Sequence, residues 1–223
     1  MEDKTNIEEA VSEKAQKFSL GHELFEWAYT IVIAVAIALV VKTFVFDIVQ
    51  VDGASMFPTL TDGDRLIVQK IGYSPKCGDI VILDSNYKKR GEYYKEKENE
   101  TGKSMNAVQK GIDYFFLPKD LKTKYYVKRV IAEGGQTVDL RGGRVYVDGE
   151  CLEEEYYNGV TQITDATNEF PQTVREGYVF VMGDNRPRSL DSRDSHLGQV
   201  PLKAVVGASR FRIWPINNVG ITK

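Results

Sequence analysis

An almost unbroken apolar run near the N-terminus is the clearest pattern in the chain. Residues 27–41 are all apolar except Tyr29 and Thr30, and apolar residues resume shortly after Lys42. A helix of about 20 residues spans about 30 Å, which is the thickness of the hydrocarbon core of a bilayer. The pattern therefore predicts a single transmembrane helix over residues 26–46.

Two other interpretations of this run stay open, namely a buried core helix and a cleaved secretory signal. The preceding segment, residues 1–25, is predicted to be a polar tail. Up to residue 26, three lysines face seven carboxylates, which is the wrong sign for the start of a secretory signal. The acidic tail also gives no positive-inside signal, so charge alone does not orient the helix in a membrane.

Short runs with β character, separated by Gly or Pro clusters, fill most of the remaining chain. Gly142-Gly143 and Asp148-Gly149 are hairpin signals and predict a small β subdomain at about residues 134–175. We expect a mostly β domain over residues 47–223, built as a barrel or sandwich. The predicted strands are 48–51, 65–69, 79–83, 125–132, 137–140, 144–147, 178–182 and 204–213.

The segment 86–124 differs from the rest because it is crowded with Lys, Glu and Tyr and is broken by Gly91 and Gly102. The simplest interpretation is a solvated surface insertion. The apolar patch Tyr114-Phe115-Phe116-Leu117 keeps an alternative open, in which the segment is a basic flap that touches anionic lipid or substrate.

Composition excludes several classes of function. A net charge of −3 gives no reason to expect nucleic acid as a partner. No Cys or His cluster has metal-ligand spacing, so we expect neither a metal nor another cofactor. Two cysteines, Cys77 and Cys151, are too few for a disulfide framework, and whether they pair stays open.

Ser55 lies in a sequence that predicts a tight, exposed turn, residues 51–60. Gly53 allows unusual backbone angles, Ala54 leaves open space before the serine, and Pro58 fixes the exit of the turn. A serine nucleophile needs such a turn, a base that is neutral at working pH, and donors for the oxyanion. A serine beside a glycine is, however, usually just a turn.

The base for such a serine is a lysine or one of only two histidines. His22 precedes the apolar run and His196 lies in a polar run, so neither is an obvious triad member. Lys128 and Arg129 are neighbours in the predicted strand 125–132, so one of them points toward a core face. Lysine can be buried by losing its proton, whereas arginine cannot. An edge strand with both charges in water is the alternative.

Four sequence blocks, taken in order, resemble those of bacterial type I signal peptidases, which remove signal peptides from secreted preproteins. The resemblance covers the chain from the apolar run to Val206, except residues 86–124. It implies a signal-peptidase-type β-barrel or sandwich with a small β subdomain, behind one N-terminal transmembrane helix. The blocks are Ser55–Leu60, Gly63–Val68 with Gly78–Val81, Tyr126–Ile131, and Gly183–Arg193.

The resemblance implies a role for each matching residue at the reacting centre. Ser55 matches the nucleophile, Lys128 the general base, and Ser189 the serine that hydrogen-bonds and orients the lysine amine. The Ser55 backbone N–H would bind the oxyanion. Gly53 stands where some members carry a second, hydroxyl donor for the oxyanion, so here only backbone can serve.

The resemblance also implies two ion pairs that hold the site, Arg129 with Asp184 and Asp191 with Arg193. Met56 matches the residue beside the nucleophile that lies near the lipid surface.

The predicted function is a membrane-anchored serine endopeptidase that cuts signal peptides from exported preproteins after small residues of the Ala-x-Ala type. The implied partners are these preproteins, membrane lipid and the surroundings of the export machinery, with the chain acting as a monomer. We expect a single-pass protein of the cell membrane with its catalytic domain on the extracytoplasmic side. Two other functions stay open: a self-cleaving Ser–Lys repressor-type protease without an anchor, and a non-catalytic, membrane-tethered β module.

Overall fold

The computed structural model describes residues 20–165 and 168–222, and the chain divides into two units between Val45 and Phe46. In the first unit it describes the α-helix α2 (Leu20–Val40) and the π-helical turn Val41–Val45. Most of the predicted polar tail, up to residue 19, lies outside the described residues.

Helix α2 is long and apolar enough to cross a membrane. Its window Glu23–Val40 has a mean hydropathy of 1.9, and none of it is buried, unlike the core helix of a soluble protein. The sequence pattern extended this helix to residue 46. In the structure Phe46 instead begins the first strand, because it pairs with Gln69 of the next one.

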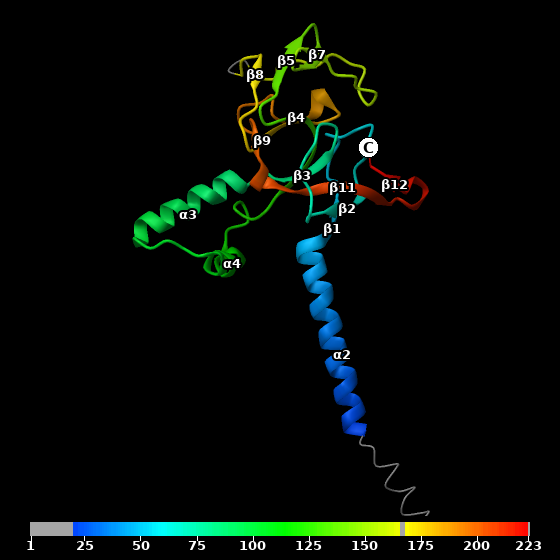
Figure 1. Ribbon diagram of the computed structural model, residues 1–223, viewed down its shortest axis with the longest axis vertical. Coiled ribbons are helices and arrows are strands. Elements are labelled where there is room, and N and C mark those ends of the chain that lie inside the picture. The colour runs from blue at the N-terminus through cyan, green and yellow to red at the C-terminus, as the bar shows by residue number, and fades with distance from the viewer. Residues whose placement is uncertain (1–19, 166–167, 223) are drawn as a thin grey trace, which may run out of the picture. The chain divides into compact units, whose positions relative to one another are not determined.

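The second unit is built on two antiparallel sheets (Figure 1). The larger has the order β1-β2-β11-β3-β4-β9-β10, with β12 also paired to β11. Its strands are β1 (Phe46–Gln50), β2 (Arg65–Gln69), β3 (Ile80–Asp84), β4 (Tyr125–Glu133), β9 (Tyr178–Met182), β10 (Val200–Pro201), β11 (Val205–Trp214) and β12 (Gly220–Ile221). The prediction of a mostly β domain is confirmed.

The smaller sheet has the order β7-β6-β5-β8. Both of its hairpins turn at residues with positive φ, namely Gly142-Gly143 and Asp148-Gly149, as two-residue turns of this kind require. A shared apolar core, which includes Val138, Phe180 and Met182, packs this sheet against the larger one. The strands are β5 (Thr137–Arg141), β6 (Arg144–Val147), β7 (Glu150–Cys151) and β8 (Gln172–Thr173).

Two helices, α3 (Tyr87–Thr101) and α4 (Ala107–Phe116), fill the segment between β3 and β4. Gly91, read from sequence as a breaker, lies inside α3, whereas Gly102 ends that helix with a φ of 64°. The helices have a small core of their own, made of Tyr94, Leu117 and Leu121.

Strand β4 is an interior strand of the larger sheet. It pairs with β3 on one side and β9 on the other, and its residues 127–132 are buried on both faces. Lys128 and Arg129 both belong to this buried stretch, at 3% exposure each. The alternative of an edge strand with both charges in water is therefore wrong, and the fold has to accommodate two buried basic residues side by side.

Candidate active site

The loop after β1 carries Ser55 and is held rigidly by backbone contacts. The Gly53 amide, at a φ of 86°, donates to Asp62 Oδ1 at 2.8 Å. The Ser55 carbonyl accepts from the Asn185 amide at 3.0 Å, and the Asn185 side chain donates to the Ala54 carbonyl at 2.9 Å. These contacts fix Ser55 between the β1 loop and the loop after β9.

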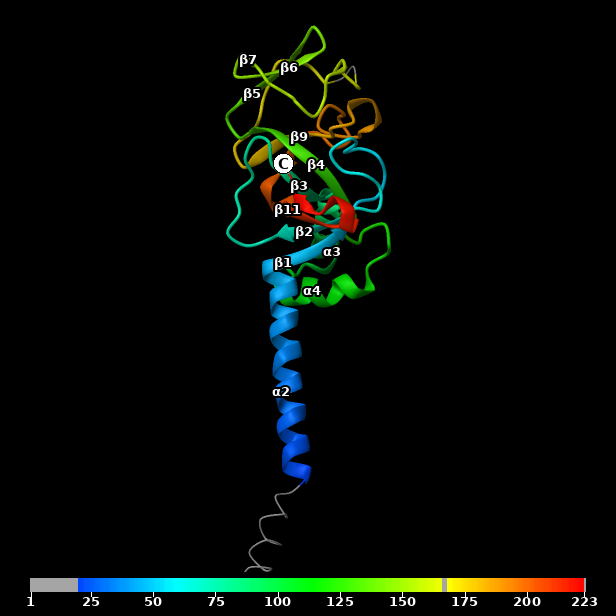
Figure 2. The same cartoon turned by 90° about the vertical axis from the view of Figure 1, so that its right-hand side faces the viewer.

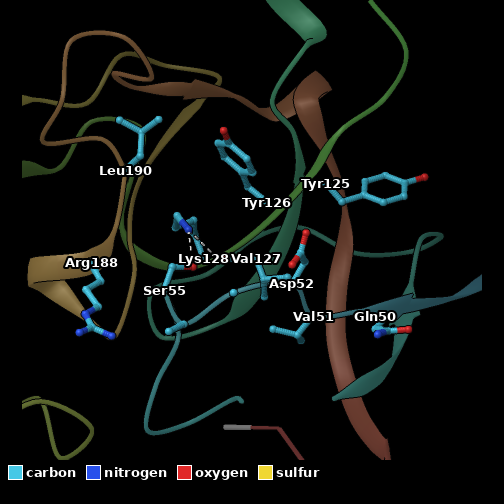
Figure 3. A pocket seen from close by; sticks show the side chains of 12 residues that line it. Gln50, Val51, Asp52, Ser55, Tyr125, Tyr126, Val127, Lys128, Arg188 and Leu190 are labelled. Carbon is cyan, nitrogen blue, oxygen red and sulfur yellow. Dashed lines mark hydrogen bonds between the residues drawn. The ribbon is translucent and has the colours of Figure 1, made fainter. Parts of the chain in front are cut away.

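The amine of Lys128 lies against the hydroxyl of Ser55. Lys128 Nζ is hydrogen-bonded to Ser55 Oγ at 2.8 Å and donates to the Val127 carbonyl at 3.0 Å (Figure 3). The ring of Tyr126 is centred 5.4 Å from the same nitrogen. The structure thus brings together two residues that are 73 positions apart in sequence.

Burial lowers the pKa of Lys128 to about 8, because removal from water penalises the charged amine. Asp191 and Asp184 oppose this shift and raise the pKa, but by less than burial lowers it. An amine with a pKa near 8 is neutral in about a tenth of molecules at pH 7, whereas an ordinary lysine is almost wholly protonated.

Each of the two opposing carboxylates is paired with its own arginine, as the sequence predicted. Arg129 donates to both oxygens of Asp184, at 2.9 and 2.7 Å, and Arg193 donates to both oxygens of Asp191, each at 2.9 Å. All four side chains are buried. Because each carboxylate is paired with a guanidinium group, neither requires a protonated Lys128 amine as its counter-ion.

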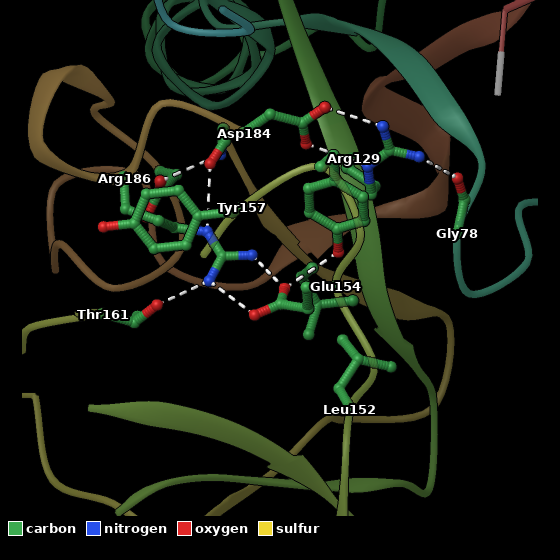
Figure 4. A network of polar contacts seen from close by, with 12 residues as sticks. Gly78, Arg129, Leu152, Glu154, Tyr157, Thr161, Asp184 and Arg186 are labelled. Carbon is green, nitrogen blue, oxygen red and sulfur yellow. Dashed lines mark hydrogen bonds and ion pairs between the residues drawn. The ribbon is translucent and has the colours of Figure 1, made fainter. Parts of the chain in front are cut away.

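A second layer of contacts, which sequence reasoning missed, supports these pairs (Figure 4). Arg186 is 1% exposed and forms an ion pair with Glu154, which lies in the loop after β7. It also donates to Thr161 Oγ1 at 2.6 Å, and its carbonyl accepts from Arg193 at 2.7 Å. The ring of Tyr156 lies 3.9 Å from the guanidinium of Arg129. These contacts hold the segment after β7 against the site. They join residues far apart in sequence, so no local sequence pattern could predict them.

Ser189 does not form the contact expected of it. Its Oγ is buried and has no hydrogen-bond partner among residues 20–165 and 168–222, so the expected bond to the Lys128 amine is not made in this structure. A buried hydroxyl without a partner is costly, and such groups often mark a functional site.

Gly183 is a residue of the site that sequence reasoning quoted but gave no role. A Cβ built on it would lie 2.3 Å from Ser189 Oγ and 2.4 Å from the Ser55 carbonyl oxygen. No side chain fits at such distances, so the absence of one allows the loop of Ser55 to approach the end of β9. Its position directly before Asp184 was the available signal.

Met56 and Gly53 both belong to the loop of Ser55. Met56 is fully buried in a core cluster with Val49 and Leu66, and its nearness to a lipid surface stays a prediction. The Gly53 amide is occupied by Asp62 and is not free to bind an oxyanion. The Ser55 amide, in contrast, donates no hydrogen bond to any described residue.

His196 and the two cysteines take no part in the contact between Ser55 and Lys128. The side chain of His196 is 85% exposed and contacts Asp194, and the side chain of His22 lies outside the described part of the structure. Cys77 and Cys151 are both free thiols.

An open cleft of about 230 Å³ runs past the Ser55 hydroxyl (Figure 3). One wall is the loop from Gln50 to Ser55, and the other is the start of β4, from Tyr125 to Lys128. Arg188 and Leu190 complete the lining. A serine hydroxyl in an open cleft, in contact with a buried amine, is the arrangement of a serine hydrolase that uses lysine where others use histidine.

Comparison with known proteins agrees with this class. The family described as signal peptidase, peptidase S26, matches residues 24–214. Signal peptidase I of Bacillus licheniformis is 36% identical over 207 residues, covering 89% of this chain and 92% of the relative. Signal peptidase I T of Bacillus subtilis is 33% identical over 231 residues, covering 100% and 98%. A solved signal peptidase I of Enterococcus faecalis, 25% identical, covers 61% of this chain and 97% of its own with a TM-score of 0.39, too low to support an argument.

The chain therefore belongs to the signal peptidase family, peptidase S26. It is a serine peptidase that cleaves signal peptides from secreted preproteins, as the sequence predicted. A repressor-type protease and a non-catalytic β module are thereby set aside.

Gly183→Ala tests whether the close approach at Gly183 positions Ser55. The added Cβ displaces the Ser55 carbonyl or the Ser189 hydroxyl, and a misplacement of about 1 Å can cost about 10²-fold in rate. We expect kcat to fall by about that factor, with KM changing far less. Gly91→Ala, in α3 with nothing within 4 Å of its Cβ, is the matched control and should leave kcat unchanged. Equal rates for both variants would contradict this assignment.

Proposed function

We propose that Ser55 is the nucleophile and Lys128 the general base with which this protein cleaves signal peptides. The observation that carries the proposal is the 2.8 Å contact between Ser55 Oγ and a Lys128 amine that is 3% exposed and has a lowered pKa. Contact supplies the path for the proton, and the lowered pKa supplies an amine that can accept it.

The reaction then proceeds in two halves. Neutral Lys128 Nζ takes the proton of Ser55 Oγ while the oxygen attacks the carbonyl carbon before the scissile bond. The ammonium gives that proton to the leaving amine of the mature protein, and the signal peptide stays as an ester on Ser55. A water molecule, deprotonated by Lys128, hydrolyses the ester. The Ser55 amide is the proposed donor to the oxyanion.

Ser189 is proposed as the residue that orients the Lys128 amine. Its buried hydroxyl has no partner in the described structure. The hydroxyl and the Ser55 carbonyl oxygen both border the position that a Cβ on Gly183 would take. The two ion pairs are proposed to keep Asp184 and Asp191 from holding the lysine proton.

The substrate is proposed to bind as an extended strand in the cleft between the Ser55 loop and β4. Backbone groups of both walls would hold its main chain. Val51, Val127 and Leu190 give the cleft apolar surface, and its volume of about 230 Å³ suits small side chains before the cut better than large ones.

Helix α2 is proposed to be a single-pass anchor in the cell membrane, with the catalytic unit on the extracytoplasmic side, near the export machinery and as a monomer. Strand β1 follows the helical segment without a linker. The outer face of the large sheet carries a cross-strand row of apolar residues, in which Ile48 is 63% and Ile221 72% exposed. An exposed apolar row next to an anchor supports contact with lipid.

Ser55→Ala and Lys128→Met test the catalytic pair. Removing a general base costs about 10²–10⁴-fold, and we expect each variant to lose at least that much cleavage of a preprotein while melting at or above the wild-type temperature. Lys124→Met, which removes an exposed lysine one position before β4, is the matched control and should retain full activity. Cleavage by Lys128→Met at the wild-type rate would reject Lys128 as the base.

The pH dependence of kcat/KM tests the state of the amine. Below the lowered pKa of Lys128 the amine is protonated and cannot take the serine proton, so activity is lost as the pH falls and rises through about pH 8. The measurement uses a peptide substrate without titratable groups beside the scissile bond. An ascending limb centred near pH 6.5, the value of an ordinary histidine, would speak against a lysine base.

Labelling of a single thiol tests the proposed side of the membrane. Cys151 is exposed, so in a Cys77→Ser background it is the only reporter. A membrane-impermeant maleimide should label it in right-side-out membrane vesicles without detergent, and in inside-out vesicles only after detergent is added. The reverse pattern would place the catalytic unit in the cytoplasm, and Cys77→Ser/Cys151→Ser controls for background labelling.

A further inference from the structure

Helix α4 presents an apolar face to the outside of the unit. Val108 is 71% exposed, Ile112 59%, Phe115 77% and Phe116 82%. Their spacing puts them on one side of the helix. Soluble monomers rarely expose so many large apolar side chains together, and contiguous patches of this kind mark surfaces that contact a partner or a membrane.

The charged residues of α4 point the other way, toward α3. Lys110 forms an ion pair with Glu98 at 2.9 Å, and Asp113 forms one with Lys97. The Lys110 carbonyl accepts a hydrogen bond from the buried Tyr94 at 3.1 Å. Helix α4 is therefore amphipathic with its polar side turned inward, the reverse of a helix that packs on a soluble core.

This orientation is built into the fold. A capping box joins Asn106 and Gln109 at the start of the helix. At its end Lys122 Nζ donates to the Phe115 carbonyl at 3.2 Å, and the hydroxyl of Tyr114 contacts Thr123 Oγ1 at 3.0 Å. Leu117, directly after the helix, is buried. With both ends fastened, the helix cannot roll its apolar face inward without breaking these contacts.

Helix α4 lies at the end of the catalytic unit where β1 begins, as both views show (Figures 1 and 2). Burial raises the pKa of the Tyr125 hydroxyl, and Asp47 of β1 and Tyr114 of α4 add to this shift, so both elements lie near Tyr125. Since β1 follows the apolar helical segment without a linker, the first residues of β1 would lie close to the surface of a bilayer that holds α2.

The surroundings of the apolar face carry exposed basic residues. Lys103 precedes α4 and Lys119 follows it, and both are exposed. A helix with an apolar face and basic flanks is the pattern of segments that lie in the plane of a membrane interface, where lysines meet anionic headgroups.

We propose that α4 is an interfacial membrane helix, whose face of Val108, Ile112, Phe115 and Phe116 inserts between lipid headgroups. The occupant of the face is the bilayer surface, and anionic lipid strengthens the contact through the flanking lysines. This inference rests on the proposed membrane anchoring by α2. A second attachment would restrict the rotation and tilt of the catalytic unit and so hold the cleft at a set height above the bilayer.

Depth-dependent fluorescence quenching tests the proposal on the full chain in vesicles of phosphatidylcholine and phosphatidylglycerol. An environment-sensitive fluorophore is attached to Phe116→Cys in a Cys77→Ser/Cys151→Ser background. The matched control carries the fluorophore at Cys151, in the small sheet, in a Cys77→Ser background. We expect lipid-borne quenchers to remove most of the emission at position 116 and to leave the emission at position 151 unchanged.

Three results would overturn the inference. In protein that floats with the vesicles, an unquenched label at position 116 contradicts it while leaving the anchor intact. A label that becomes shielded only as the protein-to-lipid ratio rises would instead assign the face to a second copy of the chain. If the protein fails to float with the vesicles, the anchor is refuted, and the inference with it. Cleavage of a detergent-soluble peptide would still report on Ser55 and Lys128 in that case.

A charge variant gives an independent readout. Ile112→Glu with Phe116→Glu alters exposed side chains only, so we expect unchanged cleavage of a short peptide in detergent and an unchanged melting temperature. Cleavage of a preprotein inserted in vesicles should fall severalfold, and more steeply when phosphatidylglycerol is present. Ile163→Glu, at an apolar residue that is 50% exposed in the loop after β7, is the control and should lower neither activity. If the double variant and the Ile163→Glu control cleaved the inserted preprotein equally fast, this result would contradict the role of α4.

Discussion

The site depends on one constraint, which is that the Lys128 amine is buried without a carboxylate of its own. Strand β4 buries two basic residues in succession, and the fold treats them differently. Arg129 donates to both oxygens of Asp184 and to the Gly78 carbonyl, and its guanidinium lies over the ring of Tyr156. Lys128 Nζ contacts a serine hydroxyl, one carbonyl and the ring of Tyr126, and it forms no hydrogen bond with a carboxylate of a described residue. Burial therefore lowers the pKa of Lys128, which suits its proposed role as a base.

The rest of the unit serves to maintain that difference. Asp191 lies close enough to raise the pKa of Lys128, yet Arg193 claims both of its oxygens. The carbonyl of Arg186 in turn accepts a hydrogen bond from Arg193. Arg186 itself forms an ion pair with Glu154, which lies in the loop after β7. The small sheet is therefore more than an appendage, because its following loop supplies the counter-charge that completes this chain of buried ions.

How much of this could be predicted depended on whether the signal was local. Strands such as 65–69 and 144–147 follow from alternation and turn residues, and Ser55 and Lys128 were found because burial of adjacent charges and the motif around the serine are both local features. Helix α3 was not predicted because its 15 residues are nearly all polar. Its stability comes from pairing with α4, for example through the ion pair of Lys97 with Asp113. The roles of Glu154 and Gly183 escaped because each depends on a distant segment. The burial of Met56 escaped as well, because no sequence pattern shows that a methionine beside the nucleophile packs into the core.

In the proposed mechanism, substrate binding would complete the desolvation that folding begins. Lys128 lines the cleft, whose apolar surface an extended peptide would cover. Excluding water there would further disfavour the ammonium, so the contact that presents the scissile carbonyl to Ser55 would also lower the pKa of the proposed base. A peptide with a large side chain beside the cut would not settle into the cleft and would leave the amine hydrated and protonated. On this proposal the preference for small residues and the strength of the base have the same physical origin, which is closure of the cleft over the amine.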